Sequence, residues 1–187
     1  MPSPLAHGLV GLTVHVLASR DRAELRDPWR LGVTVGASLA PDLDLAFKLV
    51  DGRNHHNYAF HSIGFALLAA VSGAFVYRLL RWARPIVLGL VTGLAWASHL
   101  LIDYLNVDTH PPIGLMALWP FSHAFYKSPV PLFMDIGRTL TWTTVRHDAV
   151  AGAWECVVLF PLLLGAWRYK GRRLEEPGWH ADSRASP

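Results

Sequence analysis

The sequence contains one cysteine, Cys156, among its 187 residues. A single thiol forms no internal disulfide, and it excludes a zinc module built from several cysteines. The excess of basic over acidic residues is also small, with a formal net charge of +3. The arginines cluster at the ends of apolar runs, which fits orientation in a membrane and argues against a nucleic-acid partner. No basic residue precedes the first apolar run, so we expect no cleavable signal peptide.

Hydrophobic residues, in contrast, are abundant. They form 52% of the chain, which includes eight tryptophans, and this is too apolar for an ordinary soluble domain. The longer apolar runs match the roughly 20 residues that a helix needs to cross a bilayer. There are five runs, at residues 4–19, 29–50, 62–80, 85–105 and 149–169.

These runs predict an all-α fold, a polytopic membrane bundle of about five helices. We expect residues 1–173 to form one integral-membrane domain and residues 174–187 to form a disordered cytoplasmic tail. Buried helices of a soluble bundle are the alternative, but basic residues at both ends of several runs argue against it.

The basic residues also predict an orientation. Most of them lie at residues 20–30, at residues 78–84 and after residue 168, and the positive-inside rule places these segments in the cytoplasm. The links at residues 51–60 and 106–147 then face the other side of a plasma membrane of the bacterial inner-membrane type. Five helices with the N-terminus outside satisfy this alternation.

Two ionisable residues lie in the fourth run. His99 and Asp103 are four residues apart, so a helix places them on one face. Ionisable groups inside a membrane are costly and mark functional sites. Counted from the arginine-bearing ends, His7, Asp42, His61 and His99 lie at a common depth of roughly 20–25 Å. We therefore predict a metal site near the extracytoplasmic surface; a hydrogen-bonded pair that joins two helices is the structural alternative.

Asp44 has two possible roles in this site. On an α-helix Asp42 and Asp44 are about 200° apart, so both face one site only if Pro41 breaks the helix. We take Asp42 as the ligand, and Asp44 as a further ligand or as a partner that orients a histidine.

The ligand chemistry indicates a divalent metal. Histidine and carboxylate without thiolate suit zinc in a hydrolytic role, with manganese or iron(II) as alternatives. An open coordination position lowers the pKa of bound water. The candidate ligands suffice for two ions if Asp103 bridges them, and we expect one to three ions in all.

Several motifs occur in a characteristic order after His7. They are Pro41-Asp42-Leu43-Asp44, His56 to Ser62, His99-Leu100-Leu101-Ile102-Asp103 and Trp119-Pro120-Phe121-Ser122. In this order the chain resembles the YdjM-like family of membrane-bound, metal-dependent hydrolases over residues 1 to about 122. That family is distantly similar to the superfamily of zinc-dependent phospholipases C and single-strand nucleases.

The resemblance implies a phospholipase C-like helical core and cleavage of phosphate esters. It implies His7, Asp42, His61, His99 and Asp103 as metal ligands. We add Asp44, His56 and His110 as further candidates; His110, in the long link, either binds another ion or covers the site. Asn57 stands where the family motif has arginine, which removes the phosphate contact expected there.

We therefore expect a membrane-embedded, metal-dependent hydrolase that acts on a phosphate ester of a lipid or lipid-linked substrate through metal-activated water. Asp42, His61 and Asp103 are the expected catalytic residues. The alternative is a non-catalytic, metal-stabilised scaffold or regulator of the membrane. A third class, a transporter of a cation or proton, fits less well because the cytoplasmic half of each run lacks matching polar groups.

Overall fold

The computed structural model describes residues 1–109, 111–137 and 139–175, and this part of the chain is helical, with no strand in it. The all-α prediction is confirmed. The helices are α1 (Pro4–Ala18), α2 (Arg22–Arg26), α3 (Pro28–Leu39), α4 (Lys48–Asp51), α5 (Ile63–Leu79), α6 (Pro85–Tyr104) and α7 (Trp142–Glu175), with the 3₁₀ segments η1 (Ala40–Phe47) and η2 (Ala59–His61).

Local sequence explains where the principal helices begin. The side chains of Ser3, Asp27 and Ser62 each accept a hydrogen bond from a backbone N–H in the first turn of α1, α3 and α5. These residue types are preferred there because they satisfy amides that have no partner within the helix. In addition, α1, α3 and α6 each begin with proline, which lacks the N–H that would otherwise be unpaired.

The second apolar run is divided rather than continuous. It forms α3, the 3₁₀ segment η1 and the short α4. Pro41 stands at the change, since proline lacks a donor and clashes with the carbonyl four residues earlier. A 3₁₀ helix has about three residues per turn, which turns Asp42 and Asp44 closer to a common side than an α-helix does. Asp44 is fully buried and Asp42 half-buried.

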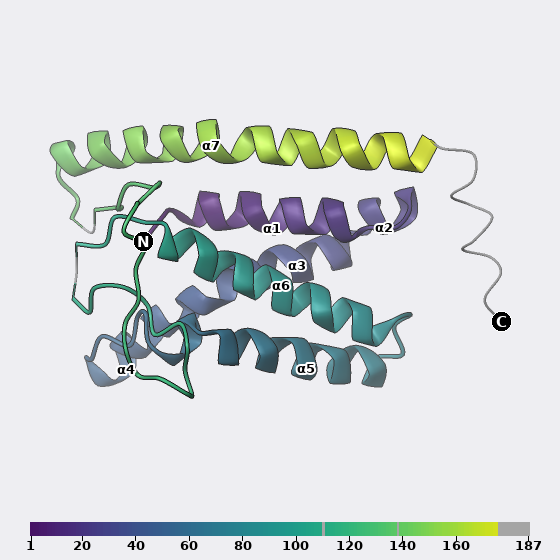
Figure 1. The fold of residues 1–187 in the computed structure, drawn as a ribbon, viewed down its shortest axis with the longest axis horizontal. Coiled ribbons are helices and arrows are strands. Elements are labelled where there is room, and N and C mark those ends of the chain that lie inside the picture. Colours follow the sequence, from purple (N-terminus) through teal and green to yellow (C-terminus); the bar gives the residue numbers. More distant parts are fainter. Residues whose placement is uncertain (110, 138, 176–187) are drawn as a thin grey trace.

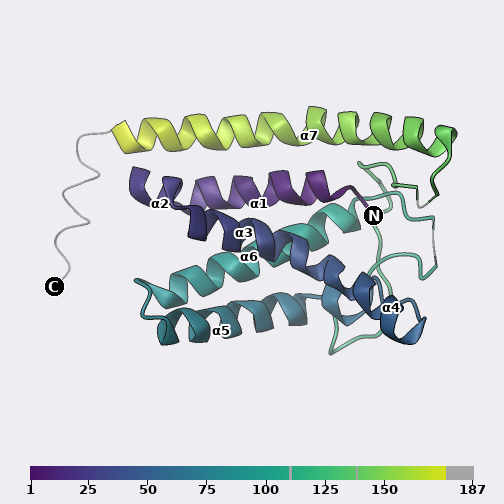
Figure 2. The same ribbon diagram turned by 180° about the vertical axis from the view of Figure 1, so that it is seen from behind.

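The helices stack in layers (Figure 1). The long α7 lies along one side, α1 lies next to it, α3 and α6 cross each other between α1 and α5, and α5 forms the opposite side. The view from behind shows the same order (Figure 2). Consequently α1 contacts α3, α6 and α7, and it occupies the middle of the bundle.

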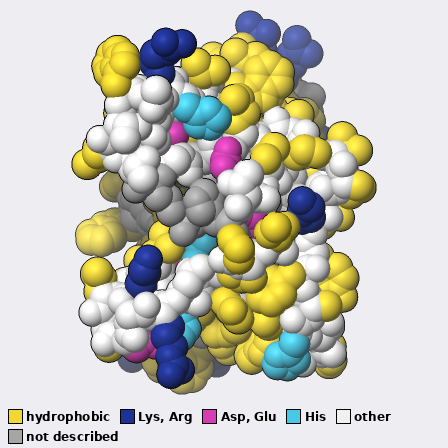
Figure 3. Space-filling view, turned by 90° about the vertical axis from the view of Figure 1, so that its left-hand side faces the viewer, with side chains coloured by type: hydrophobic (Ala, Val, Ile, Leu, Met, Phe, Trp, Pro, Cys, Tyr) yellow, Lys and Arg dark blue, Asp and Glu magenta, His cyan; other side chains and the backbone are white. Residues whose placement is uncertain are grey.

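The two ends of the bundle differ. The arginine-bearing segments, namely α2, the α5–α6 turn and the end of α7, lie together at one end (Figure 1). Ion pairs join them there: Arg22 lies 3.7 Å from Glu175, and Arg84 lies 3.7 Å from Glu24. The N-terminus, α4 and the long link between α6 and α7 lie at the other end. Seen from that other end, histidine, acidic and basic side chains are scattered among hydrophobic patches (Figure 3).

Two helices within the described residues are long and apolar enough to cross a membrane. They are α6 and α7, whose most apolar stretches of 18 residues have mean hydropathies of 1.8 and 1.9. α1 and α5 are apolar but shorter, at 15 and 17 residues, and α3 has 12 residues. Large hydrophobic side chains such as Val157, Phe160 and Leu162 of α7 are exposed on the outer surface. α7 also extends through Glu175, into the first two residues of the expected tail; residues 176–187 lie outside the described residues.

α5 and α6 approach closely because α6 carries glycine at the contact. A Cβ atom on Gly89 would lie 2.6 Å from the Ala74 Cβ and still closer to the Ala70 carbonyl oxygen. One on Gly93 would lie 2.7 Å from the Ala70 Cβ. Small residues that let two backbones approach are typical of helix contacts in membranes.

Replacing Gly89 with alanine therefore tests this contact. We expect Gly89→Ala to destabilise the protein by about 1–3 kcal/mol, because the methyl group has no space. Gly165→Ala in α7 is the control, since a Cβ there meets no atom within 4 Å. The measurement is the thermal unfolding midpoint in detergent, and equal midpoints for the two variants would contradict the packing described.

Candidate metal centre

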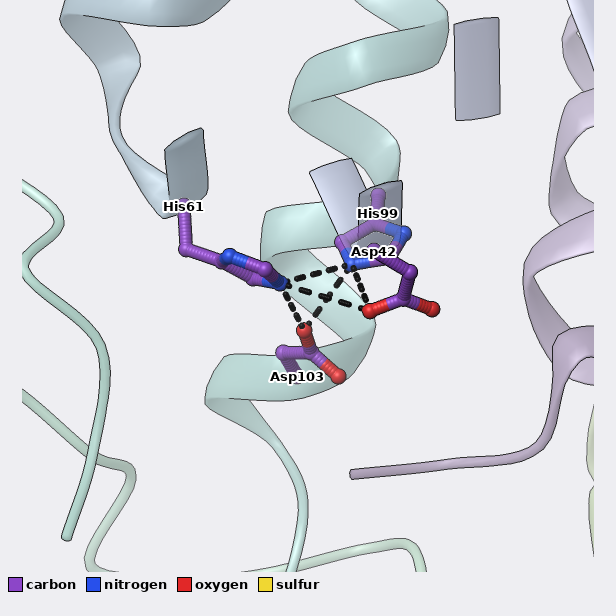
Figure 4. A group of neighbouring side chains, drawn as sticks. All are labelled: Asp42, His61, His99 and Asp103. Carbon is purple, nitrogen blue, oxygen red and sulfur yellow. Dashed lines mark hydrogen bonds and ion pairs between the residues drawn. The ribbon is translucent and has the colours of Figure 1, made fainter. Parts of the chain in front are cut away.

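Four side chains from three segments converge at the link-bearing end of the bundle. Asp42 comes from η1, His61 from η2, and His99 and Asp103 from successive turns of α6, and they point toward one another (Figure 4). His61 is the last residue before Ser62 caps α5. Each residue offers one ligand atom, and the four atoms lie within 4.8 Å of one another.

The spacing of these atoms matches a tetrahedral metal site. The His99 Nε2 lies 3.1 Å from the His61 Nε2 and 3.0 Å from the Asp103 Oδ2. The His61 Nε2 lies 3.3 Å from the same Asp103 Oδ2. The Asp42 Oδ1 lies 3.6 Å from the His61 Nε2 and 3.5 Å from the His99 Nε2. Ligands at about 2.0–2.1 Å from a tetrahedral zinc ion are about 3.3–3.4 Å apart. The described donors therefore fit one ion at their centre.

Neighbouring groups set the orientation of both histidines. The His99 Nδ1 lies 2.8 Å from the Ser38 carbonyl oxygen, to which its N–H donates, so Nε2 keeps a lone pair. The His61 Nδ1 lies 3.0 Å from the Asp44 Oδ2, which favours the same tautomer. Two lone pairs facing each other repel, and a shared cation removes that repulsion. Metal-bound histidines are ordinarily held in this way through their second nitrogen.

Buried polar atoms without partners support the same conclusion. Among the described residues, the Asp42 Oδ1, both Asp103 carboxylate oxygens and both ring nitrogens of His7 are buried and accept or donate no hydrogen bond. A buried charge without compensation is costly. A divalent cation compensates the two carboxylates, so the residues present fit such an ion.

His7 lies beside this group rather than inside it. Its Nε2 is 3.6 Å from the Asp103 Oδ1, and its ring stacks on His99 with centroids 3.8 Å apart. Asp103 thus turns one oxygen toward His61 and His99 and the other toward His7. This arrangement suits a carboxylate that bridges two cations.

Asp44 and His56 form a second group with His61. The Asp44 Oδ1 lies 3.0 Å from the His56 Nδ1, while its Oδ2 faces His61. Each carboxylate oxygen of Asp44 therefore faces a ring nitrogen of a different histidine. The group can orient His61 or hold a further ion; His110, the remaining expected ligand, lies outside the described residues.

With this geometry described, comparison with known proteins gives one match. A family model for the YdjM inner membrane protein matches residues 1–174. The chain belongs to the YdjM inner membrane protein family. No curated protein and no solved structure matches the chain significantly. Membership of the YdjM family agrees with the two long apolar helices and with the expected membrane location, and it carries no statement about activity.

Ser3, Ser38 and Glu155 help to hold the YdjM centre in place, and of these only Glu155, a glutamate inside an apolar run, is marked by the sequence. The Ser38 hydroxyl donates to the His7 carbonyl oxygen at 2.9 Å, in addition to the bond that its own carbonyl accepts from His99. Glu155 of α7 is fully buried and accepts hydrogen bonds from the Ser3 amide, at 2.7 Å, and from the Ser3 hydroxyl. Glu155 therefore ties α7 to the start of α1, one turn before His7.

Removing one imidazole tests the centre. We expect His99→Ala to lower the zinc bound per purified chain by about tenfold or more, because the site loses a ligand and the contact to Ser38. His55→Ala is the control, since the His55 side chain is 40% exposed and pairs with Asp51, away from the four candidate ligands. Metal content is measured by elemental mass spectrometry. Full zinc stoichiometry in the His99 variant would contradict the assignment.

Proposed function

We propose that this YdjM family member is a metal-dependent hydrolase that acts on a phosphate ester of a lipid or lipid-linked substrate. The observation that carries the proposal is a set of donors at tetrahedral spacing in which one side chain reaches solvent. The side chain of Asp42 is 16% exposed, whereas those of His61 and His99 are fully buried. A bound divalent ion, zinc by its ligands or else manganese or iron(II), would lower the pKa of water and polarise the phosphoryl group.

The protein's own residues have distinct tasks in this proposal. Asp42 is at the solvent-facing side of the group, where its carboxylate can accept a proton from an entering water molecule. His61 is held by Asp44 so that its Nε2 faces the centre. Asp103 presents one carboxylate oxygen toward His99 and the other toward His7, so each oxygen would be available to a metal ion.

An apolar groove favours a lipid substrate. It has a volume of about 420 Å³ and lies between α3, α5 and α6, where Ala40, Phe65, Leu68 and Trp96 are among its lining residues. Ala40 is two residues before Asp42, and Trp96 is one turn before His99, so the groove ends beside the segments that carry the ligands. An acyl chain in this groove would bring a headgroup toward the centre. The positive-inside rule places this end of the bundle at the extracytoplasmic face.

One observation favours a second candidate function. Two imidazoles and two carboxylates are enough to fill a tetrahedral shell without water. In that case the ion is structural, and the protein is a metal-stabilised scaffold or regulator of the membrane. The two functions differ in whether the zinc-loaded protein turns over a substrate.

A hydrolysis assay with zinc-loaded protein in lipid nanodiscs distinguishes the hydrolase from the scaffold. We expect release of a phosphorylated headgroup from one phospholipid, or of inorganic phosphate from one polyprenyl phosphate, in a panel of both kinds, with loss on chelation and recovery with zinc. Asp42→Asn should lower the rate by about 10²–10⁴-fold, as expected for a residue that transfers a proton, while His55→Ala should not change it. Zinc-replete protein that hydrolyses no member of the panel would favour the scaffold.

A further inference from the structure

The apolar groove beside the metal centre extends along the side of the bundle. Residues of α3, α5 and α6 line it, and α6 contacts both of the other helices. The lining residues on α5 run from Phe65 to Tyr77, which corresponds to about 18 Å of helix. α5 begins at the link-bearing end of the bundle and finishes at the arginine-bearing end (Figure 1). The groove is therefore elongated along an expected membrane span.

One end of the groove adjoins the candidate ligands. Each of its three sides includes a lining residue within four residues of a ligand, namely Ala40 before Asp42, Phe65 after His61 and Trp96 before His99. The Trp96 Nε1 donates a hydrogen bond of 2.9 Å to the Phe60 carbonyl oxygen, beside His61. Its ring also stacks on Phe65, with centroids 6.2 Å apart. A ligand in the groove would therefore pass fixed aromatic rings before it reaches the centre.

The three hydroxyl groups that line the groove have no donor hydrogen left for a ligand. The Ser72 hydroxyl donates to the Leu68 carbonyl oxygen at 2.7 Å, and the Thr92 hydroxyl donates to the Leu88 carbonyl oxygen at 2.9 Å. The Tyr77 hydroxyl lies 2.8 Å from the Thr92 hydroxyl and donates to it. A polar ligand would lose hydrogen bonds to water here without compensation, whereas a hydrocarbon chain has none to lose. The lining therefore favours a hydrocarbon chain.

Small residues leave the space that such a chain needs. α3 contributes Gly36, Ala37 and Ala40 to the lining, and α5 contributes Ala69 and Gly73. A Cβ atom on Gly36 would meet no atom within 4 Å, so this glycine borders open space. A larger side chain at Gly36 would therefore occupy the groove without displacing a neighbour.

We propose that the groove binds one hydrocarbon chain of the lipid substrate and that the open space at Gly36 lets the protein select long chains over short ones. This inference rests on the proposed hydrolysis of a lipid phosphate ester, and it specifies which part of the substrate is recognised. A lipid chain is the favoured occupant because Leu68 and Val76 of the lining are exposed on a helix expected to lie in the bilayer. The substrate would then enter from the side, with its phosphate at the centre.

Binding of alkylphosphonates tests the groove without turnover, because a phosphonate has no ester bond to hydrolyse. Zinc-loaded full-length protein in amphipol is titrated with dodecylphosphonate and with butylphosphonate by isothermal titration calorimetry. The butyl chain is too short to reach Gly36, which lies six residues before Asp42, or roughly 9 Å along a helix. We expect Gly36→Phe to lower the ratio of dodecyl to butyl affinity by about tenfold, the effect of roughly two methylene groups that lose their burial.

The control is Gly165→Phe, which should keep the ratio of the unmodified protein. Gly165 lies on α7, on the other side of the bundle from α5 (Figure 1), and a Cβ there also meets no atom within 4 Å. Zinc content and the thermal unfolding midpoint show whether Gly36→Phe is folded. Ser72→Phe, at an exposed lining residue of α5, replaces it if it is not.

An unchanged ratio in the folded groove variant, or an equal fall in the control, would overturn the proposal. An unchanged ratio together with conversion of a dimer to a monomer would assign the groove to a second copy of the chain instead. Failure of the hydrolase proposal gives a different result, in which the ratio falls as expected but zinc-replete protein hydrolyses no lipid of the panel. Hydrolysis of a long-chain lipid by Gly36→Phe at the unmodified rate would support the hydrolase and overturn the groove.

Discussion

The fold depends on keeping two imidazole nitrogens face to face inside an apolar bundle. The Nε2 atoms of His61 and His99 are 3.1 Å apart, and the carboxylates of Asp42 and Asp103 are beside them. Desolvating two carboxylates costs several kcal/mol each unless a cation or hydrogen bonds compensate. A cation bound between these four side chains would offset that cost and make the arrangement stabilising. Because η1, η2 and α6 each supply part of it, the centre joins segments that are far apart in the sequence.

Other elements of the bundle hold the side chains of the centre in position through hydrogen bonds and ion pairs. α3 fixes His99 through the Ser38 carbonyl, and η1 fixes His61 through Asp44. α7 reaches the centre indirectly, since Glu155 holds Ser3 at the start of α1 and α1 carries His7. Both imidazoles of the centre are thereby oriented by an element other than their own.

Much of this arrangement is encoded in patterns that a sequence displays. Helix periodicity places His99 and Asp103 on one face, and the common depth of His7, Asp42 and His61 follows from counting residues. The structure brings these residues together. Pro41 also predicts the end of the α-helix before Asp42, because the effect of proline on the backbone is local and does not depend on its surroundings. The 3₁₀ segment that follows directs both Asp42 and Asp44 toward His61.

Other features could not be predicted because they depend on tertiary packing. The Ser38 carbonyl is a backbone group, and any residue type offers one, so its bond to His99 leaves no trace in the sequence. The partner of Glu155 is 152 residues away. Hydropathy also did not show that the second run ends as an α-helix at Leu39 or that α7 extends to Glu175.

Anomalous X-ray diffraction at the zinc edge, from crystals of the zinc-loaded protein, tests the central claim most directly. The account predicts an anomalous peak within about 2.0–2.1 Å of the Nε2 atoms of both His61 and His99, with carboxylate oxygens of Asp42 and Asp103 completing the ligand set. A map without a peak between the two imidazoles, in protein shown to contain zinc, would contradict it.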